Sequence, residues 1–413
     1  LMIRRPPRST LDRSSAASDV YKRQLIDNKI PYPSQKIFSI DDARELAKWR
    51  LPKLVFDFVD GASGNEFLSI NNNKAYENIK LEPRVLINVE ERSLKTKFLD
   101  SEYGLPFGFA PMGMCNLTWP NADTMLAKEA IDNNIPICSS MAASTSLEKI
   151  YELSNGLAWF QLYIGQDEDF VLDLLNRAQD CGYKTIILTV DVPILARRSR
   201  DNRNGFDIPF RMSIKNFIDF ATHPNWSLRT LYHGAPTNMN YVTSKSGKRF
   251  VRGESRGKID WNTLKMLRDK WKGHLIVKGV MNEDDAIKIK NYGVDAIYIS
   301  NHGGRQLDCA PTSINALPKI RQKVGAKFPL IIDSGIRSGS DILKALALGA
   351  NFVMIGRPLM YGLGADSHPG LIKILQIIEN ELSTALGLVG LTDIKYVSRK
   401  ILSKNLLENI GYG

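Results

Sequence analysis

The chain of 413 residues has little cysteine and no long apolar segment. Its four cysteines, Cys115, Cys138, Cys181 and Cys309, are too few for a disulfide framework at this length, and no two stand at metal-ligand spacing. We therefore expect no metal site and a reducing, cytoplasmic location. No run of about 18 apolar residues occurs, so we expect no helix that spans a membrane.

The first 24 residues lack hydrophobic periodicity and have no apolar stretch of the kind found in secretory signal peptides. Asp12, Asp19 and the Pro6-Pro7 pair argue against the amphipathic helix of a transit peptide. We predict that residues 1–24 form a non-native or disordered extension and that residues 25–413 form a single domain.

Positive charge is unevenly distributed along the chain. Lysine and arginine number 55 against 44 acidic residues, a net charge of +11, of which residues 1–24 carry +4 and residues 195–258 carry +9. A high positive charge can indicate nucleic-acid binding, but here the excess sits in one tail and one internal segment, and we expect no nucleic-acid partner. An anionic small substrate, an anionic membrane surface or an acidic protein partner would each suit the internal segment.

Short apolar runs alternate with helical patterns over most of the chain, which is typical of βα units around a parallel sheet. Eight such units favour a closed (β/α)8 TIM barrel, of class α/β, over an open doubly wound sheet. The longest gap, after the fourth run, contains the basic segment. The runs are Pro106–Met112, Ile135–Ser140, Ala158–Ile164, Thr185–Asp191, Leu275–Gly279, Ala296–Ser300, Pro329–Asp333 and Asn351–Gly356.

The predicted plan of the domain follows from these runs. N-terminal helices occupy 40–100, where Ser39 and Asp42 predict a capped helix start and a second helix follows Leu51-Pro52 and ends at Gly61. The barrel occupies 101–365 with a long basic insertion at 195–258 after strand four, and C-terminal helices occupy 366–413.

Polar residues gather at the predicted strand ends, where the active site of such a barrel lies. His302, one of five histidines, is a candidate general base, and Asp191 is a candidate to orient it. Lys278 interrupts a run that should be apolar, and Arg198 and Arg305 could grip a carboxylate. The alternatives are a hydrogen-bonded loop histidine and a lysine that reaches the surface.

Two glycine-rich turns follow the last two strands. Residues 333–337 read DSGIR and precede a predicted helix start near Ser338, and Gly356 with Arg357 follows the last run. Backbone N–H groups and a helix N-terminus in this position suit a phosphate group. The alternative is a pair of ordinary tight turns.

The chain resembles the FMN-dependent L-2-hydroxy acid oxidase and dehydrogenase family. The resemblance runs from about Ile40 to the C-terminus with the motifs in the family's order, and it is carried by SNHGGRQLD, LTVDVPILARR, FQLY, LIVKG, DSGIRSGSD and IGRP. Glycolate oxidase, lactate oxidase, lactate dehydrogenase and mandelate dehydrogenase belong to it. The resemblance implies an FMN enzyme with a homo-oligomeric, tetrameric assembly.

The same resemblance implies a role for each matching residue. His302 would take the substrate proton with Asp191 stabilising the charged ring, and Lys278 would stabilise the anionic reduced flavin. Arg198, Arg305 and Tyr163 would bind the substrate. The expected cofactor-binding residues are Pro111, Met112, Gly113, Ser139, Gln161, Thr189, Lys278 and Ser300 at the flavin ring, and Asp333, Ser334, Gly335, Ile336, Arg337, Gly356 and Arg357 at the phosphate.

Two positions depart from the family pattern. Phe58 stands where the family usually has a tyrosine whose hydroxyl helps to bind the carboxylate, so that more of this binding falls on the two arginines. Gly113 stands where several oxidases have alanine, and glycine there is found in dehydrogenase and monooxygenase members. This difference suggests that oxygen is not the natural electron acceptor.

Our first hypothesis is an enzyme that oxidises an L-2-hydroxy acid, L-lactate-like, to the 2-oxo acid and passes electrons to quinone or a cytochrome. Net charge and apolar residues in the insertion, including Phe217, Trp226 and Tyr232, suit peripheral binding to the inner face of an anionic membrane. The alternative for the insertion is a lid whose aromatic residues pack on the barrel. The alternatives for the whole chain are a soluble oxidase that reduces oxygen to peroxide, another FMN or phosphate-binding barrel, and a non-catalytic barrel that binds an acidic surface.

Overall fold

The computed structural model describes residues 34–165, 167–206, 212–242, 250 and 255–403, so the extension predicted at 1–24 lies outside it. Eight parallel strands close into a barrel in the order β10-β3-β4-β5-β6-β7-β8-β9, which confirms the predicted (β/α)8 fold. The strands are β3 (Phe107–Met112), β4 (Ile137–Ser140), β5 (Ala158–Leu162), β6 (Thr185–Thr189), β7 (His274–Lys278), β8 (Ala296–Ile299), β9 (Leu330–Ile332) and β10 (Phe352–Ile355). Each predicted run contains one of them, shortened by up to two residues at one or both ends, except that β7 begins one residue earlier than its run.

The inside of the barrel is packed with side chains. Residues such as Ile187, Ile276 and Tyr298 fill it, because alternate residues of each strand face inward. A hairpin of β1 (Thr96–Phe98) and β2 (Ser101–Tyr103) covers the amino ends of the strands. Phe98 and Tyr103 pack there against Phe352, with ring centroids 5.0 and 5.4 Å away. Space for a ligand is therefore left at the carboxyl ends.

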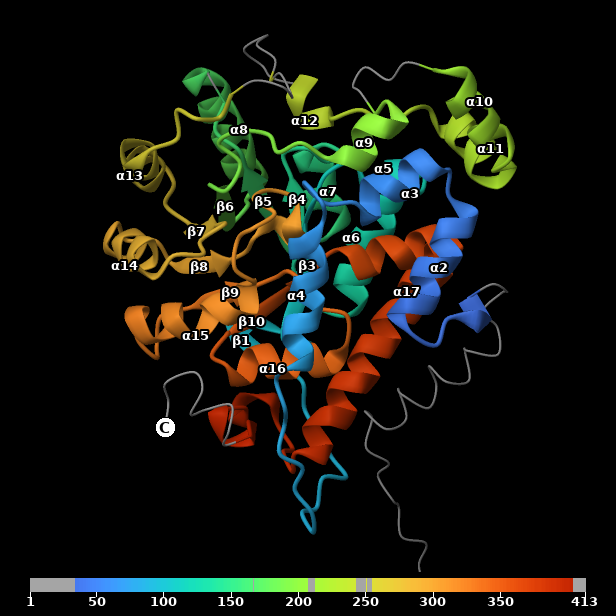
Figure 1. Cartoon of the computed structure of the whole chain (residues 1–413). Coiled ribbons are helices and arrows are strands. Elements are labelled where there is room, and N and C mark those ends of the chain that lie inside the picture. Colours follow the sequence, from blue (N-terminus) through green and yellow to red (C-terminus); the bar gives the residue numbers. More distant parts are fainter. Residues whose placement is uncertain (1–33, 166, 207–211, 243–249, 251–254, 404–413) are drawn as a thin grey trace, which may run out of the picture.

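Helices surround the barrel, as Figure 1 shows. The last of them, α17 (Arg357–Leu388), begins directly after β10 and has non-helical backbone angles at Asp366 and Ser367. The predicted boundary between barrel and C-terminal helices at 365 thus lies at a kink inside one element. The others that alternate with the strands are α6 (Ala122–Asp132), α7 (Leu147–Leu153), α8 (Glu168–Cys181), α13 (Trp261–Lys270), α14 (Glu283–Asn291), α15 (Ser313–Val324) and α16 (Gly339–Ala347).

The N-terminal region supplies a short η1 (Ser34–Lys36) and three helices, α2 (Ile40–Arg50), α3 (Lys53–Asp60) and α4 (Phe67–Glu77). Ser39 Oγ accepts from the N–H of Asp42 at 3.1 Å, which confirms the capped start of α2. The prediction of helices over 40–100 is wrong beyond Glu77, because residues 78–95 contain no helix. They bond instead to the C-terminal segment, for example from the N–H of Glu82 to the carbonyl of Ile401 at 2.8 Å, and then lead into the β1–β2 hairpin. Short 3₁₀ turns, η3 (Ile394–Tyr396) and η4 (Arg399–Ile401), end the described chain.

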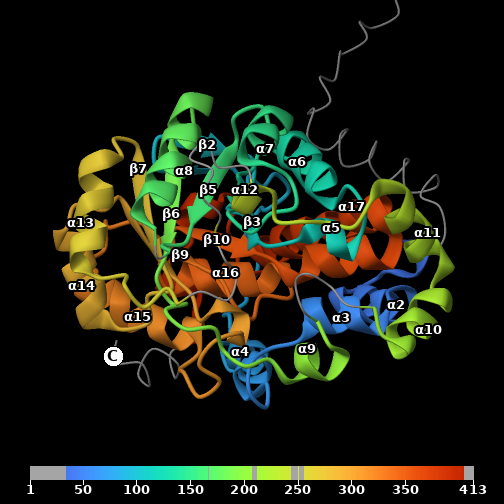
Figure 2. The ribbon, with the colours of Figure 1, turned by 90° about the horizontal axis from the view of Figure 1, so that it is seen from above.

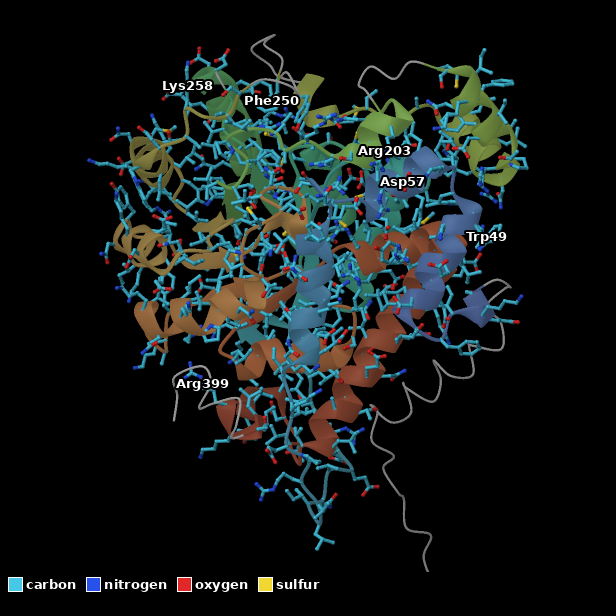
Figure 3. The ribbon with its side chains drawn as sticks, viewed as in Figure 1. Trp49, Asp57, Arg203, Phe250, Lys258 and Arg399 are labelled. Carbon is cyan, nitrogen blue, oxygen red and sulfur yellow. The ribbon has the colours of Figure 1, made fainter. Side chains whose placement is uncertain are left out.

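The insertion after β6 consists of short helices joined by irregular segments. They are α9 (Ser199–Asn204), α10 (Ile214–Ala221), α11 (Pro224–His233) and α12 (Met239–Val242). In both Figure 1 and Figure 2, α10 and α11 stand at the periphery of the molecule, while α9 lies beside α3. Figure 3 labels Arg203 on α9 close to Asp57 on α3. Over the described residues, no helix is both long and apolar enough to cross a membrane.

Candidate active site

A cavity of about 380 Å³ lies at the carboxyl ends of the strands, within the range of roughly 300–1,000 Å³ typical of ligand sites. Its walls come from the end of β3, the insertion, the loops after β8 and β9, and the start of α17. The predicted site residues that line it are Pro111, Met112, Gly113, Tyr163, Arg198, Lys278, His302, Arg305, Asp333, Ser334, Gly335, Ile336, Arg337, Gly356 and Arg357.

His302 forms a hydrogen-bonded pair with Asp191. Its Nδ1 lies 3.1 Å from both carboxylate oxygens of Asp191, so that Nε2 is the ring nitrogen left for a substrate proton. The backbone of His302 is left-handed, with φ +59°, and its N–H donates to Ser300 Oγ at 3.0 Å. Two separate loops, after β6 and β8, thereby hold the pair in place.

The electrostatics of this pair favour a neutral base. Burial lowers the pKa of His302, the charge of Lys278 acts in the same direction, and Asp191 offsets these effects only in part. Burial raises the pKa of Asp191, but the opposing effects of His302 and Lys278 are larger together, so the pKa is lowered overall and Asp191 is a carboxylate. A neutral imidazole beside an ionised carboxylate is the arrangement that general-base catalysis requires.

Lys278 is buried, with 3% of its surface exposed, which excludes a lysine that reaches the surface. Its Nζ donates to Ser300 Oγ at 2.9 Å and lies 3.7 Å from Asp333 Oδ2. Asp333 also accepts from the hydroxyl of Tyr298 at 2.8 Å. A fixed positive charge therefore faces the cavity from inside the barrel.

Arg305 and Phe58 form one wall of the cavity. Arg305 Nη1 donates to the carbonyls of Phe58 and Gly61, each at 2.8 Å, and its guanidinium lies 5.4 Å from the centre of the Phe58 ring. Phe58 also packs on Phe206 of the insertion at 4.7 Å between ring centroids. Position 58 therefore faces the cavity, as the family resemblance implied.

Tyr163 and Arg198 also line the cavity. Arg198 Nη1 lies 3.7 Å from Asp201 Oδ2, and burial lowers the pKa of this arginine. Burial raises the pKa of Tyr163 to about 12, and its hydroxyl is therefore protonated and able to donate a hydrogen bond.

The loop at 333–337 forms an anion-binding shape. Ser334 and Gly335 both have left-handed backbone, with φ +78° and +91°, and Ser338 caps α16 by accepting from the N–H of Asp341 at 3.1 Å. A left-handed turn of this kind can present successive N–H groups to an anion, whereas the N–H groups of Arg337 and Gly339 already donate to the carboxylates of Asp341 and Glu381, at 3.0 and 2.8 Å. This agrees with the phosphate interpretation rather than with ordinary turns.

Arg357 is tied to three backbone carbonyls. It donates from Nε to Val59 at 3.2 Å, from Nη1 to Gly303 at 2.8 Å and from Nη2 to Gly61 at 2.9 Å. The side chain lines the cavity but also joins the end of α3 to η2 (His302–Gly304). This structural part of its role was not predicted.

Four predicted flavin-binding residues do not line the cavity but lie at the strand ends beneath it. They are Ser139, Gln161, Thr189 and Ser300, all buried. Gln161 Oε1 accepts from Ser140 Oγ at 2.9 Å, whereas Gln161 Nε2 and Thr189 Oγ1 have no hydrogen-bond partner among the described residues. Ser140, not Ser139, has its side chain in the cavity wall, because neighbouring strand residues face opposite sides.

Several lining residues have no counterpart in the predicted set. Asn238, Tyr241 and Arg256 come from the insertion and reach the cavity from beyond the helices α10 and α11. Outside the cavity, Asn72 of α4 exchanges two amide hydrogen bonds with Asn301, at 2.9 and 2.7 Å, and so supports the His302 loop. No motif marks these residues, since each depends on how a distant segment folds back. No cluster of three or more metal-binding side chains occurs in the described ranges.

Comparison with known proteins gives the family directly. The FMN-dependent dehydrogenase family matches residues 47–404. An (S)-mandelate dehydrogenase of Pseudomonas putida is 35% identical over 91% of this chain and 96% of its own, and an L-lactate dehydrogenase of Pseudomonas syringae is 34% identical over 89% and 99%. A 2-hydroxyacid oxidase of Dictyostelium discoideum is 33% identical over 94% and 95%.

Solved structures agree with this result. The crystal structure of a monotopic membrane protein, (S)-mandelate dehydrogenase, superposes with a TM-score of 0.85 at 35% identity, over 89% of this chain and 99% of that one. The chain therefore belongs to the FMN-dependent dehydrogenase family. More specifically, it is an enzyme of the 2-hydroxy acid dehydrogenase and oxidase group, which acts on small 2-hydroxy acids with FMN as cofactor.

The residues present fit FMN. The unpartnered Gln161 Nε2 and Thr189 Oγ1 supply buried hydrogen-bonding atoms for the polar edge of a flavin ring, and Lys278 supplies a cation beside it. The left-handed turn at Ser334 and Gly335 supplies backbone N–H groups for a phosphate.

Proposed function

We propose that the enzyme oxidises an L-2-hydroxy acid to the 2-oxo acid with His302 as the base. The single observation that carries this proposal is the pairing of His302 with Asp191 at 3.1 Å, on the wall of a cavity that Arg198, Arg305 and Lys278 also reach. A neutral imidazole, an anion behind it and cations around it are what proton removal from an anionic hydroxy acid requires.

The residues divide the work between binding and proton transfer. Arg305 and Arg198 hold the substrate carboxylate through charge-assisted hydrogen bonds, and Tyr163 donates to the carboxylate or hydroxyl oxygen. His302 Nε2 accepts the proton, and Asp191 stabilises the imidazolium that results. FMN, when bound, accepts the two electrons of the oxidation. Lys278 places its positive charge where the reduced ring gains negative charge.

Replacement of His302 by glutamine tests this proposal. FMN binding should stay close to that of the parent, while anaerobic flavin reduction by L-lactate or L-mandelate should slow by at least about 10²–10⁴-fold. His274→Gln, at the opposite end of the barrel on β7, is the matched control and should leave the rate unchanged. A His302 variant that reduces its flavin at the parental rate would show that the base lies elsewhere.

We also propose that the electron acceptor is a quinone or cytochrome at an anionic membrane, reached through α10 and α11. Apolar side chains of these helices, and of Met212 two residues before α10, are largely exposed: Met212 (58%), Ile214 (82%), Phe217 (63%), Ile218 (58%), Leu228 (66%), Leu231 (80%) and Tyr232 (87%). We call this set the α10–α11 apolar surface. A group of this kind on a peripheral pair of helices suits an interfacial contact.

The lid alternative accounts for only part of the insertion. Trp226 is buried, its Nε1 donates to the carbonyl of Leu117 at 3.0 Å, and Phe220 packs on it at 5.3 Å. These two rings anchor α10 and α11 to the body of the protein. The side chains of the α10–α11 apolar surface are exposed rather than packed on the barrel, and the related monotopic mandelate dehydrogenase supports the same assignment.

Co-sedimentation tests the membrane proposal. The holoenzyme should bind phosphatidylglycerol vesicles, bind phosphatidylcholine vesicles less, and release from the former as salt rises. The double variant Phe217→Ser, Leu231→Ser should lose binding, whereas Leu388→Ser, an exposed leucine on α17, should not. Absence of vesicle binding at every salt concentration, with rapid peroxide production in oxygen, would contradict the membrane proposal and favour a soluble oxidase.

Finally, we propose a homo-oligomer, a tetramer as the family resemblance implies. Light scattering on the holoenzyme measures its mass directly, and a monomer would contradict the proposal.

A further inference from the structure

Three polar side chains meet inside the carboxyl end of the barrel. Tyr298 of β8 belongs to the inner core, as do Ile276 of β7 and Ile331 of β9. Lys278 and Asp333 each follow one of these isoleucines by two residues, so they face the same side. Lys278 and Tyr298 are also direct partners in the β7–β8 ladder, and Figure 1 shows β7, β8 and β9 side by side. The sheet therefore brings the three side chains together.

The carboxylate of Asp333 is shared between two hydroxyls and one lysine. Its Oδ2 accepts from the hydroxyl of Tyr298 at 2.8 Å, and its Oδ1 accepts from Ser334 Oγ at 2.8 Å. The same Oδ2 lies 3.7 Å from Lys278 Nζ, which donates instead to Ser300 Oγ at 2.9 Å. At this separation the lysine and the carboxylate attract each other but are beyond hydrogen-bond distance. The hydroxyl of Tyr298 therefore holds the oxygen that faces Lys278.

Burial makes these contacts electrostatically strong, because little water screens them. Tyr298 is fully buried, Lys278 is 3% exposed and Asp333 is 9% exposed. Burial raises the pKa of Tyr298 well above its usual value, and the charge of Asp333 raises it further. The phenol is therefore protonated and remains a hydrogen-bond donor. The centre of its ring also lies 5.1 Å from Lys278 Nζ, so the tyrosine contacts both charges.

The distance between Lys278 and Asp333 decides how much positive charge reaches the cavity. Both side chains line the cavity, whereas Tyr298 lies outside the lining. The proposed function places Lys278 where the reduced flavin ring gains negative charge, and the negative charge of Asp333 acts against this. A close ion pair would cancel more of the charge of Lys278 than the present separation of 3.7 Å does. A group that keeps the pair apart therefore favours reduction of the flavin.

We propose that Tyr298 is a positioning residue for Lys278. By donating to Asp333, its hydroxyl limits the pairing of this carboxylate with Lys278, and so raises the reduction potential of bound FMN. This inference rests on the role that the proposed function gives to Lys278. It adds a residue that lies outside the cavity lining, does not bind the substrate and takes no part in proton transfer. The hydroxyl, not the ring, carries the effect.

Tyr298→Phe is the first test, because it keeps the ring and removes only the hydroxyl. The midpoint potential of the holoenzyme is measured by equilibration with reference dyes, without any hydroxy acid. The equilibrium between oxidised and reduced flavin should move about three- to tenfold toward the oxidised form, a fall of about 15–30 mV for a two-electron couple. The affinity of the apoprotein for FMN should change by less than about threefold, because the hydroxyl does not reach the cavity.

Asp333→Asn is the second test and should have the opposite sign. Loss of the negative charge leaves the charge of Lys278 unopposed, so the midpoint potential should rise. In the double variant, the effect of Tyr298→Phe should largely disappear, because no carboxylate charge remains to be held away from Lys278. Loss of packing alone gives no reason for the two single variants to differ in sign.

Tyr151→Phe is the matched control. The hydroxyl of Tyr151, on α7 outside the barrel, donates to the carbonyl of Gly182 at 3.1 Å, and its removal should leave the potential unchanged. A potential that stays level or rises in Tyr298→Phe would overturn the proposal. If this variant yields no holoenzyme, a potential that does not rise in Asp333→Asn overturns it. If no 2-hydroxy acid reduces the parental flavin, the proposed function fails, while the potentials measured with dyes still decide this inference.

Discussion

At the scale of single residues, the cavity brings one histidine and its buried carboxylate partner together with several cations. His302 is neutral because burial and Lys278 outweigh Asp191, and this makes it ready to accept a proton. Asp191 is a carboxylate because His302 and Lys278 outweigh the cost of its burial. Lys278 thus favours both states, the neutral imidazole of His302 and the ionised carboxylate of Asp191.

Removal of the Asp191 charge should change both rate and pH dependence. Asp191→Asn should slow flavin reduction by at least about a hundredfold, because the imidazolium loses its anion. It should also move the acid limb of log kcat/KM to lower pH. The negative charge that raises the pKa of His302 is gone, so the imidazole stays neutral further into acid. A limb that moves to higher pH would contradict the assignment of His302 and Asp191 as a pair.

Phe58 offers a gain-of-function test. Phe58→Tyr adds a hydroxyl to a ring that lies beside Arg305 in the cavity wall, and KM for L-lactate should fall by about threefold to tenfold as a new hydrogen bond to the carboxylate forms. Steady-state kinetics measures the change. If KM is unchanged, position 58 lies too far from the carboxylate to contribute.

At the scale of elements, the loops after β8 and β9 are held by α4. Asn72 bonds to Asn301 on one side, and its carbonyl lies against Gly335 on the other. A Cβ on Gly335 would lie 2.3 Å from Asn72 O, a backbone atom that cannot move aside. Helix α4 therefore helps to shape the turn at Ser334 and Gly335.

Gly335→Ala should weaken FMN binding by at least about tenfold, since both the contact with Asn72 and the φ of +91° oppose a side chain. Gly293→Ala is the matched control. It also has left-handed backbone, φ +76°, but a Cβ there would meet nothing within 4 Å. Fluorescence titration of the apoprotein with FMN compares them, and equal affinities would show that the turn does not bind the phosphate.

The sequence predicted most of these elements, for physical reasons. Buried parallel strands must be apolar throughout, so a polar residue at the end of a run, such as Lys278 or Asp191, marks the site. Arg256 and Asn238 could not be found in this way. They reach the cavity by the path of an irregular insertion, and no periodicity records that path. Ser140 and Ser139 could not be separated either, because the assignment depends on which face of β4 turns inward.

At the scale of the whole molecule, Asp60 joins four parts of the chain. Its carboxylate accepts from Arg44 of α2 at 2.6 and 2.9 Å, from Arg200 of α9 at 2.7 Å and from the hydroxyl of Tyr361 of α17 at 2.8 Å. Burial raises the pKa of Asp60, but hydrogen bonds from the two arginines lower it well below its usual 3.8. The insertion is fastened to the N-terminal helices at this point.

Asp60→Asn should lower the free energy of unfolding by about 1.5–3 kcal/mol near neutral pH, because two partly exposed guanidinium groups each lose one anion, while Arg44 keeps Glu45 and Arg200 keeps Glu66. A carboxyl whose pKa is lowered on folding contributes stability above its unfolded pKa and loses that contribution as pH falls. The difference between parent and variant should therefore be constant from pH 7 to 5 and shrink below about 4.

Urea unfolding at several pH values measures this difference. Asp132→Asn, an exposed residue on α6, should change stability by less than about 0.5 kcal/mol. A difference for Asp60→Asn that grows as the solution becomes more acid would show that the carboxylate is not held in this way.

The packed barrel and the hairpin that covers its amino end restrict the path by which ligands bind and leave. Within the described chain, Phe98, Tyr103 and Phe352 close one end, so the hydroxy acid, its product and any electron acceptor that must touch the flavin all enter from the carboxyl end of the barrel. If they share the same path, these molecules bind and leave one after another. Initial-rate plots at several acceptor concentrations should then give parallel lines, as in a ping-pong scheme, and intersecting lines would contradict a shared entrance. Product release must then precede binding of the next ligand, and the product should inhibit the enzyme.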